Sequence, residues 1–150
     1  MEEKYRKSVF VVVYRKTSEG IFFLLLKRKF HWMGWEFPKG GIEPKEKIEE
    51  TIKRELKEET GQVPLKIRNH NFSGKYEYDK AIPGREAIGQ KFFLYSAEIK
   101  SKKIILDKEE HSKYLWMPYS GAYKKITYEN QKKCLEIVNN FLMMRKKNLS

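Results

Sequence analysis

Cysteine and long apolar stretches are both nearly absent from this sequence. Cys134 is the only cysteine among 150 residues, which excludes an internal disulfide framework and any zinc site built from several cysteines. No apolar run approaches the roughly 20 residues that a membrane-spanning helix needs, and the charged residues 1–4 come without the apolar stretch that a signal peptide requires. We therefore expect a single cytoplasmic domain over residues 1–150, without a membrane partner.

Acidic residues are outnumbered by basic ones. The chain has 32 Lys and Arg residues against 20 Asp and Glu, which gives a formal net charge of +12 and favours an anionic partner such as a nucleic acid or a nucleotide. The acids are concentrated between Glu36 and Gly61, where eight acids and six bases leave this segment at −2 and the remainder at +14. An acidic island in a basic protein is the feature to explain.

Apolar periodicity predicts an α/β protein in which a mixed sheet is sandwiched between helices, an α/β/α arrangement. A helix is expected over residues 45–60, with Pro44 in its first turn and Gly61 as its C-terminal cap, and a second over 128–145, where Cys134 lies in the apolar stripe. Strands are expected at residues 8–14, 21–26, 65–79, 91–99 and 104–106, and loops at 30–41 and 81–90.

The helix expected at residues 45–60 carries acids on its inward side. At about 100 degrees per residue, Glu55 and Glu59 fall beside the apolar stripe, whereas Glu58 falls at its flank. Carboxylates four residues apart repel, and burying one unpaired is costly, so their convergence favours a hard, oxygen-seeking cation, Mg²⁺ or Mn²⁺. A helix with solvated, mutually paired Glu and Lys side chains is the alternative, and the geometry alone leaves both interpretations open.

A fixed pattern of glycines, acids and one arginine extends across residues 40–62. Gly40 and Glu46 are followed by Arg-Glu-Leu-Lys-Glu-Glu-Thr-Gly at residues 54–61. The pattern resembles the Nudix box of the Nudix hydrolase family and matches eight of its nine positions; Gln62 replaces the usual aliphatic residue at the last. The resemblance implies the Nudix fold and a metal-dependent hydrolysis, by water attack on phosphorus, of a nucleoside diphosphate linked to another group.

The resemblance also implies roles for the residues of this segment. Glu55, Glu58 and Glu59 are implied to be catalytic and to bind the metal, with Glu55 also accepting the proton of the attacking water. Arg54 belongs to the same catalytic group and pairs with Glu46 to hold the loop against the helix. The other implied positions are the structural Gly40 and Gly61 and a metal-binding backbone carbonyl near Lys39 or Gly40.

The segments that flank the box resemble one branch of the family. Residues 35–41, Trp-Glu-Phe-Pro-Lys-Gly-Gly, are similar to a stretch of the asymmetrical diadenosine tetraphosphate hydrolases, and residues 110–116 keep a similar Glu, aromatic and Trp spacing. This resemblance implies a further metal-binding carboxylate at Glu110 and substrate contacts at Lys39, Gly40, Lys91, Tyr76 and Tyr114. Each also has a simpler interpretation, as a solvated charge or as a tyrosine of the core. His31, His70 and His111 lack metal-ligand spacing and are expected at the surface.

The leading hypothesis is hydrolysis of dinucleoside polyphosphates, such as diadenosine tetraphosphate to ATP and AMP, by a monomer or homodimer. Phe37 departs from the animal tetraphosphate enzymes, and Trp-x-Phe-Pro-x-Gly-Gly is also similar to bacterial RNA pyrophosphohydrolases, so the 5′ end of RNA is an alternative substrate. The basic remainder of the chain would suit RNA phosphates. A house-cleaning nucleoside triphosphatase and a non-catalytic nucleotide-binding module are further hypotheses.

Overall fold

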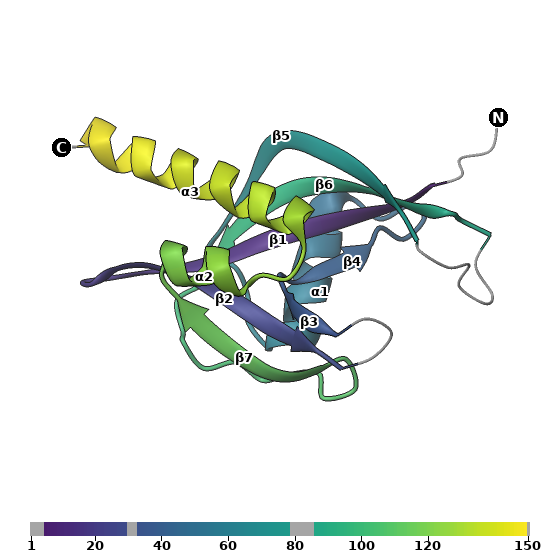
Figure 1. Ribbon diagram of the computed structural model, residues 1–150, viewed down its shortest axis with the longest axis horizontal. Helices are drawn as coiled ribbons and strands as arrows, with labels where there is room; N and C mark the ends of the chain where they lie inside the picture. Colours follow the sequence, from purple (N-terminus) through teal and green to yellow (C-terminus); the bar gives the residue numbers. More distant parts are fainter. Residues whose placement is uncertain (1–4, 30–32, 79–85, 150) are drawn as a thin grey trace.

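The structure is a computed structural model that describes residues 5–29, 33–78 and 86–149 (Figure 1). Its centre is a seven-stranded mixed sheet with the strand order β3-β2-β1-β6-β5, in which β4 also pairs with β1 and β7 with β2. Only the β1–β6 pair is parallel among these pairings. The strands are β1 (Tyr5–Thr17), β2 (Gly20–Arg28), β3 (Gly34–Glu36), β4 (Lys39–Gly41), β5 (Lys66–Glu77), β6 (Gly89–Glu98) and β7 (His111–Met117).

Helices cover both faces of this sheet. Successive side chains of β1 point to opposite faces, so Val9, Val11 and Val13 pack toward α1, whereas Phe10 and Val12 pack toward α3. In Figure 1, α3 crosses one face of the sheet and α1 lies behind the other. The predicted α/β/α sandwich is confirmed. The helices are α1 (Ile48–Thr60), α2 (Tyr119–Lys125) and α3 (Glu129–Leu149).

Strand predictions succeeded where buried β-branched and aromatic residues follow one another. Residues 8–14 and 21–26 lie in β1 and β2, and 65–79 and 91–99 correspond to β5 and β6 in their described parts. The strand expected at 104–106 is wrong, because the N–H of Ile105 donates to the carbonyl of Thr60 at the end of α1 and not to a strand. The loop expected at 30–41 contains the short strands β3 and β4, and no element was expected where β7 and α2 lie.

The helix that carries the glutamates begins later than predicted and ends as predicted. Pro44 and Lys45 form a turn closed by the Glu46 N–H on the Glu43 carbonyl (3.0 Å), and Lys45 has a positive φ of 67°, so α1 begins at Ile48. At the other end Gly61 adopts the left-handed conformation (φ 74°) and its N–H donates to the Lys57 carbonyl (3.0 Å). The glycine cap therefore places Glu55, Glu58 and Glu59 in the last two turns.

The second predicted helix corresponds to α3 and extends beyond residue 145. Cys134 is fully buried in the cluster that α3 forms with the sheet, as its apolar stripe predicts. In the described part of the chain no helix, α3 included, combines the length and the apolar character that crossing a membrane requires.

A buried hydrogen bond joins α3 to the segment that leads into the glycine-rich strand β4. The backbone N–H of Phe37 donates to Oε1 of Gln131 (2.9 Å), and both residues are almost fully buried. Because Phe37 lies between β3 and β4, this bond fixes the β3–β4 segment against α3, on the face of the sheet opposite to α1.

Replacing Gln131 with alanine tests this link. The buried N–H of Phe37 would lose its acceptor, so we expect the free energy of unfolding to fall by about 1–3 kcal/mol. Asn140 is an exposed amide on the same helix, and Asn140→Ala should change stability by less than about 0.5 kcal/mol. Urea denaturation measures both variants, and equal stabilities would contradict the link.

Candidate active site

Carboxylates from separate parts of the chain meet at the C-terminal end of α1. Glu59 is only 3 % exposed, and its ligand atom lies within 4.8 Å of those of Glu110 and His111, at the start of β7. Glu55 lies one turn earlier on the same face, with its side chain 12 % exposed. Glu58 is 54 % exposed, so the predicted inward and flanking positions of the three glutamates are confirmed.

The buried carboxyl group of Glu59 is electrostatically unfavourable as an anion. Burial raises its pKa well above the ordinary value, the charges of Glu55, Glu36 and Glu110 raise it further, and Lys39 offsets only part of this effect. In the described part of the chain, Oε2 of Glu59 is buried and has no hydrogen-bond partner. The group therefore lacks the compensation that a buried charge requires.

Glu55 is held in an intermediate state by opposing effects. Burial raises the pKa of its carboxyl group to about 7, and the charges of Glu58 and Glu110 act in the same direction, whereas a hydrogen bond from Arg54 (2.8 Å) lowers it. A carboxyl group with a pKa near neutrality can both take up and release a proton under ordinary conditions. Its chemistry is therefore suited to a general base.

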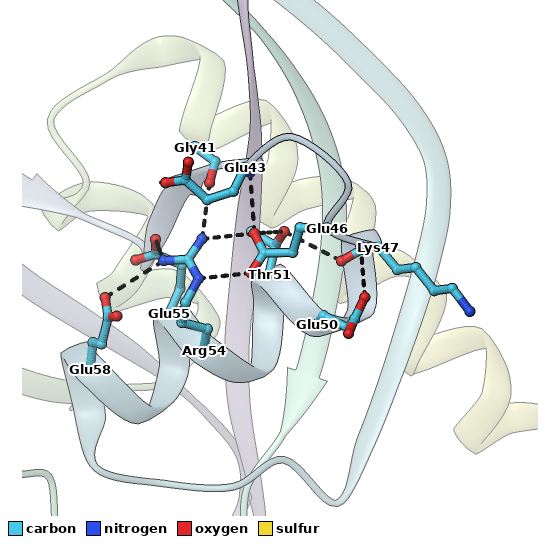
Figure 2. A network of polar contacts seen from close by, with 9 residues as sticks. All are labelled: Gly41, Glu43, Glu46, Lys47, Glu50, Thr51, Arg54, Glu55 and Glu58. Atoms are coloured by element: carbon cyan, nitrogen blue, oxygen red, sulfur yellow. Dashed lines mark hydrogen bonds and ion pairs between the residues drawn. The ribbon is translucent and has the colours of Figure 1, made fainter.

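Arg54 ties the helix to the preceding loop, as Figure 2 shows. Its guanidinium donates to both oxygens of Glu46 (2.8 and 2.9 Å), to Glu55 (2.8 Å) and to the carbonyl of Gly41 (3.2 Å). The bond from Arg54, helped by one from Thr51, lowers the pKa of Glu46 to about 2. This bidentate pair is the arrangement that the resemblance implied for Arg54 and Glu46.

A glycine is required where β4 approaches the face of α1 that carries Glu55. A Cβ atom at Gly40 would overlap the carboxyl group of Glu55, so any side chain there would displace this glutamate. The close approach brings the backbone of β4 to the acidic cluster. Ligation by a carbonyl near Lys39 or Gly40 stays a prediction.

A buried ionic network, which sequence analysis missed, lies next to the acidic cluster. Glu36 is fully buried and accepts bonds from His111 Nε2 (2.9 Å) and Arg28 Nη1 (3.2 Å), while the ammonium of Lys39 lies 3.3 Å from its other oxygen. Burial raises the pKa of Glu36, but the bond from His111 and the charges of Lys39 and Arg28 outweigh it, and the pKa falls to about 2. Glu36 therefore remains ionised beside Glu59.

The prediction that the histidines lie at the surface is wrong for His111 and for His70. His111 is 1 % exposed, and its ring forms a hydrogen bond with the buried Glu36. His70 is half-buried, its Nε2 lies 2.7 Å from Oγ of Ser96, and burial lowers its pKa to about 4. His31 lies outside the described residues. The position of Glu36 between two aromatic residues could have indicated that this acid is buried, but no neighbouring residue indicated that His111 is its partner.

The residues implied as substrate contacts are spread over the sheet. The Lys91 ammonium lies over the ring of Phe93, 5.4 Å from the ring centroid. Tyr76 packs in the core on the α3 face, whereas Tyr114 packs against the cluster on the α1 face. The sheet separates the two tyrosines, so no single base can lie between them.

The donor set fits a divalent cation. Glu55, Glu59 and Glu110 offer carboxylate oxygens, which Mg²⁺ and Mn²⁺ prefer, and one buried oxygen of Glu59 lacks a partner among the described residues. A cation there would compensate the burial and the neighbouring negative charges that raise the pKa values of Glu55 and Glu59. The cluster is thus a candidate metal site.

The comparisons with known proteins agree on one family. Residues 4–136 match the family described as NUDIX domain. The RNA pyrophosphohydrolase of a Nitratiruptor species is 31% identical over 85% of this chain and 88% of its own length, and that of a Sulfurovum species is 26% identical over 94% and 95%. The structure of a C. elegans Ap4A hydrolase binary complex is 25% identical, with a TM-score of 0.73 over 92% of this chain and 98% of that one.

The variant Glu36→Gln tests the buried network. Arg28 and Lys39 would keep their charges without the counter-charge, and the bond from His111 would weaken. We expect the free energy of unfolding to fall by about 3 kcal/mol, the low end for breaking a buried ion pair, because relief of repulsion with Glu59 offsets part of the loss.

The matched control for this variant is Glu19→Gln, at the exposed turn between β1 and β2, which should leave stability within about 0.5 kcal/mol. Metal-free protein at neutral pH is unfolded with urea in both cases. A Glu36→Gln variant as stable as the control would show that the network contributes nothing.

Proposed function

Because this chain belongs to the Nudix hydrolase family and is a Nudix pyrophosphohydrolase, we propose that it removes pyrophosphate from the 5′-triphosphate end of RNA. The observation that carries this proposal is the similarity to curated RNA pyrophosphohydrolases over most of both chains. It reverses the order expected from the sequence, where dinucleoside polyphosphates came first.

The environment of Phe37 supports this choice. Phe37 is the residue at which the sequence departs from the animal tetraphosphate enzymes, and it is 1 % exposed, with its N–H bonded to Gln131. The departure is thus built into the packing between the sheet and α3, immediately before Lys39 and Gly40. An exposed residue at this position would be weaker support for the choice of substrate, because it would not affect this packing.

The geometry of the acidic cluster supports hydrolysis of a phosphoanhydride. Glu59 and Glu110, whose ligand atoms lie within 4.8 Å of each other, would hold the metal together with Glu55 one turn earlier on α1, with Glu58 at the exposed flank. When bound, Mg²⁺ or Mn²⁺ would neutralise charge on phosphate oxygens and generate a nucleophile from water near neutral pH.

The chain's own groups supply proton transfer and positioning. The carboxylate of Glu55, on the inward face of α1 near Glu110, is placed to accept a proton from the attacking water, and the bond from Arg54 restrains its rotation. The Lys39 ammonium, kept beside the cluster by Glu36, is in place to attract phosphate oxygens. Pre-positioned charge of this kind costs little reorganisation during the reaction.

Hydrolysis of diadenosine tetraphosphate is the second candidate. The likeness to the C. elegans Ap4A hydrolase structure over nearly the whole chain favours it. The same glutamates would act on either substrate, since both present a chain of phosphates. What distinguishes the candidates is the group beyond the phosphates, a second nucleoside or an RNA chain.

The variant Glu59→Gln separates catalysis from folding. Loss of the carboxylate should lower turnover by several orders of magnitude. The metal-free variant should be at least as stable as wild type at neutral pH, because a carboxyl group whose pKa is raised on folding costs stability there and glutamine avoids this cost. Addition of Mg²⁺ should raise the Tm of wild type and not that of the variant. Calorimetry and a pyrophosphate assay measure these effects.

Glu49→Gln serves as the control, since Glu49 is an exposed glutamate on the same helix. It should retain both activity and the Mg²⁺-dependent rise in Tm. Near-normal turnover of Glu59→Gln, or an unchanged response to Mg²⁺, would disprove the metal assignment.

Competing substrates test the proposed specificity. Triphosphorylated RNA, diadenosine tetraphosphate and deoxynucleoside triphosphates are each incubated with the enzyme and Mg²⁺, and kcat/KM is compared. We expect kcat/KM for RNA to be higher by at least about tenfold, which corresponds to about 1.4 kcal/mol in the barrier, and all activity to disappear with EDTA. A higher value for the tetraphosphate would establish the second candidate instead.

A further inference from the structure

A basic cleft lies away from the acidic cluster. It has a volume of about 510 Å³ and opens between the C-terminal half of α3, the β1–β2 turn and the first residues of β5. In Figure 1 these segments lie at the end of the molecule where the C-terminus is marked. Its lining includes Tyr14, Lys16, Lys66, Arg68, Phe141 and Arg145.

The cleft is on the other face of the sheet from the catalytic helix. Tyr14 and Phe141 belong to the core cluster on the α3 face, whereas α1 packs on the opposite face through Ile52 and Leu56. Along β1, Lys16 lies six residues beyond Phe10, the partner of Lys39 in β4. At about 3.3 Å per residue, Lys16 is therefore about 20 Å along β1 from Phe10, which is paired with β4 at the active site. The cleft is therefore a separate feature.

Four cations surround this cleft, and they come from three different elements. Lys16, Lys66, Arg68 and Arg145 are all exposed, and within the described ranges no carboxylate forms an ion pair with any of them at 4.0 Å or less. Glu98, opposite Lys66 in the sheet, is the neighbouring acid. The cleft thus keeps an excess of positive charge that the folded chain does not neutralise.

The two guanidinium groups are oriented by one aromatic ring. The guanidinium of Arg68 lies 4.5 Å from the centroid of Phe141, and that of Arg145 lies 5.8 Å from it. Such cation–π contacts restrict a long side chain without consuming its N–H donors. Both arginines can therefore still donate to an anion.

The hydroxyl group of a largely buried tyrosine adds a neutral donor. Tyr14 is 6 % exposed, and its hydroxyl forms no hydrogen bond with the described residues. Burial raises the pKa of this phenol to about 12, with Glu98 acting in the same direction and Arg68 and Arg145 against it. The phenol stays protonated at neutral pH, so it can donate to a phosphate oxygen where a deprotonated group would repel it.

We propose that this cleft binds the phosphodiester backbone of the RNA chain whose 5′ end lies in the active site. The inference rests on the proposed function and names the part of the protein that would hold the substrate beyond its first nucleotides. Cations spread around an open rim suit several phosphates of a chain better than one small anion, and guanidinium groups suit phosphate oxygens.

Binding of a reaction product tests the cleft independently of catalysis. Fluorescently labelled, 5′-monophosphorylated RNA of twelve nucleotides is titrated by anisotropy with wild type and with Arg68→Gln/Arg145→Gln, in EDTA and at several salt concentrations. We expect the double variant to bind about tenfold more weakly. Its log–log salt slope should fall by about 1.4, since each lost single-strand phosphate contact contributes about 0.7.

The control Lys53→Gln/Lys57→Gln removes two exposed charges of α1, on the other face of the sheet, and should change affinity by less than about twofold. A labelled dinucleotide should bind both double variants as it binds wild type. Three results would overturn the proposal. The first is equal affinity of wild type and the arginine variant for the longer RNA, and the second is an equal loss of affinity in the control. The third is displacement of the longer RNA by millimolar inorganic phosphate when this occurs with wild type and not with the arginine variant.

Hydrolysis of a triphosphorylated dinucleotide distinguishes this proposal from the proposed function. The arginine variant should release pyrophosphate from it at the wild-type rate, because the cleft lies beyond the reach of so short a substrate. If wild type releases pyrophosphate neither from the dinucleotide nor from a triphosphorylated RNA of twelve nucleotides, the proposed function fails, while the binding measurements still test the cleft.

Discussion

The repulsion among buried carboxylates at the end of α1 is the constraint on which the rest of the site depends. Glu59 is buried in the last turn, where the helix dipole is negative and further disfavours an anion. Glu55, Glu36 and Glu110 add charge of the same sign. The surrounding structure holds these groups together: Arg54 bonds Glu55, the glycine cap ends the helix, and the absence of a side chain at Gly40 leaves room for the carboxyl group of Glu55.

Two ionic networks support this cluster from opposite sides. On one side Arg54 joins α1 to Glu46 and to the carbonyl of Gly41, which ties the helix to the loop. On the other side the fully buried Glu36 holds His111 and Lys39. The first network keeps the carboxyl group of Glu55 oriented, and the second places the Lys39 ammonium beside the acids. Together they explain how a site of like charges is preserved in the folded protein.

Sequence analysis succeeded where the determinants are local. The apolar repeat every four residues and Gly61 predict α1, and its wheel correctly places Glu55 and Glu59 inside. Prediction from the sequence failed where the interacting partner is distant in the chain. Glu36 and His111 are 75 positions apart, and the pairing of β7 with β2 is equally non-local, so no window of sequence contains both members. The start of α1 was misplaced because Pro44 also fits a turn, and Lys45 adopts one.

The central claim is that the crowded glutamates form a metal site, and crystallography with manganese tests it most directly. Crystals grown with Mn²⁺ are measured near the manganese absorption edge, and anomalous difference density locates the ion without reference to activity. The account predicts a peak at about 2.1–2.2 Å from carboxylate oxygens of Glu59 and Glu55. The absence of a peak at these residues, with Mn²⁺ bound elsewhere or not at all, would contradict it.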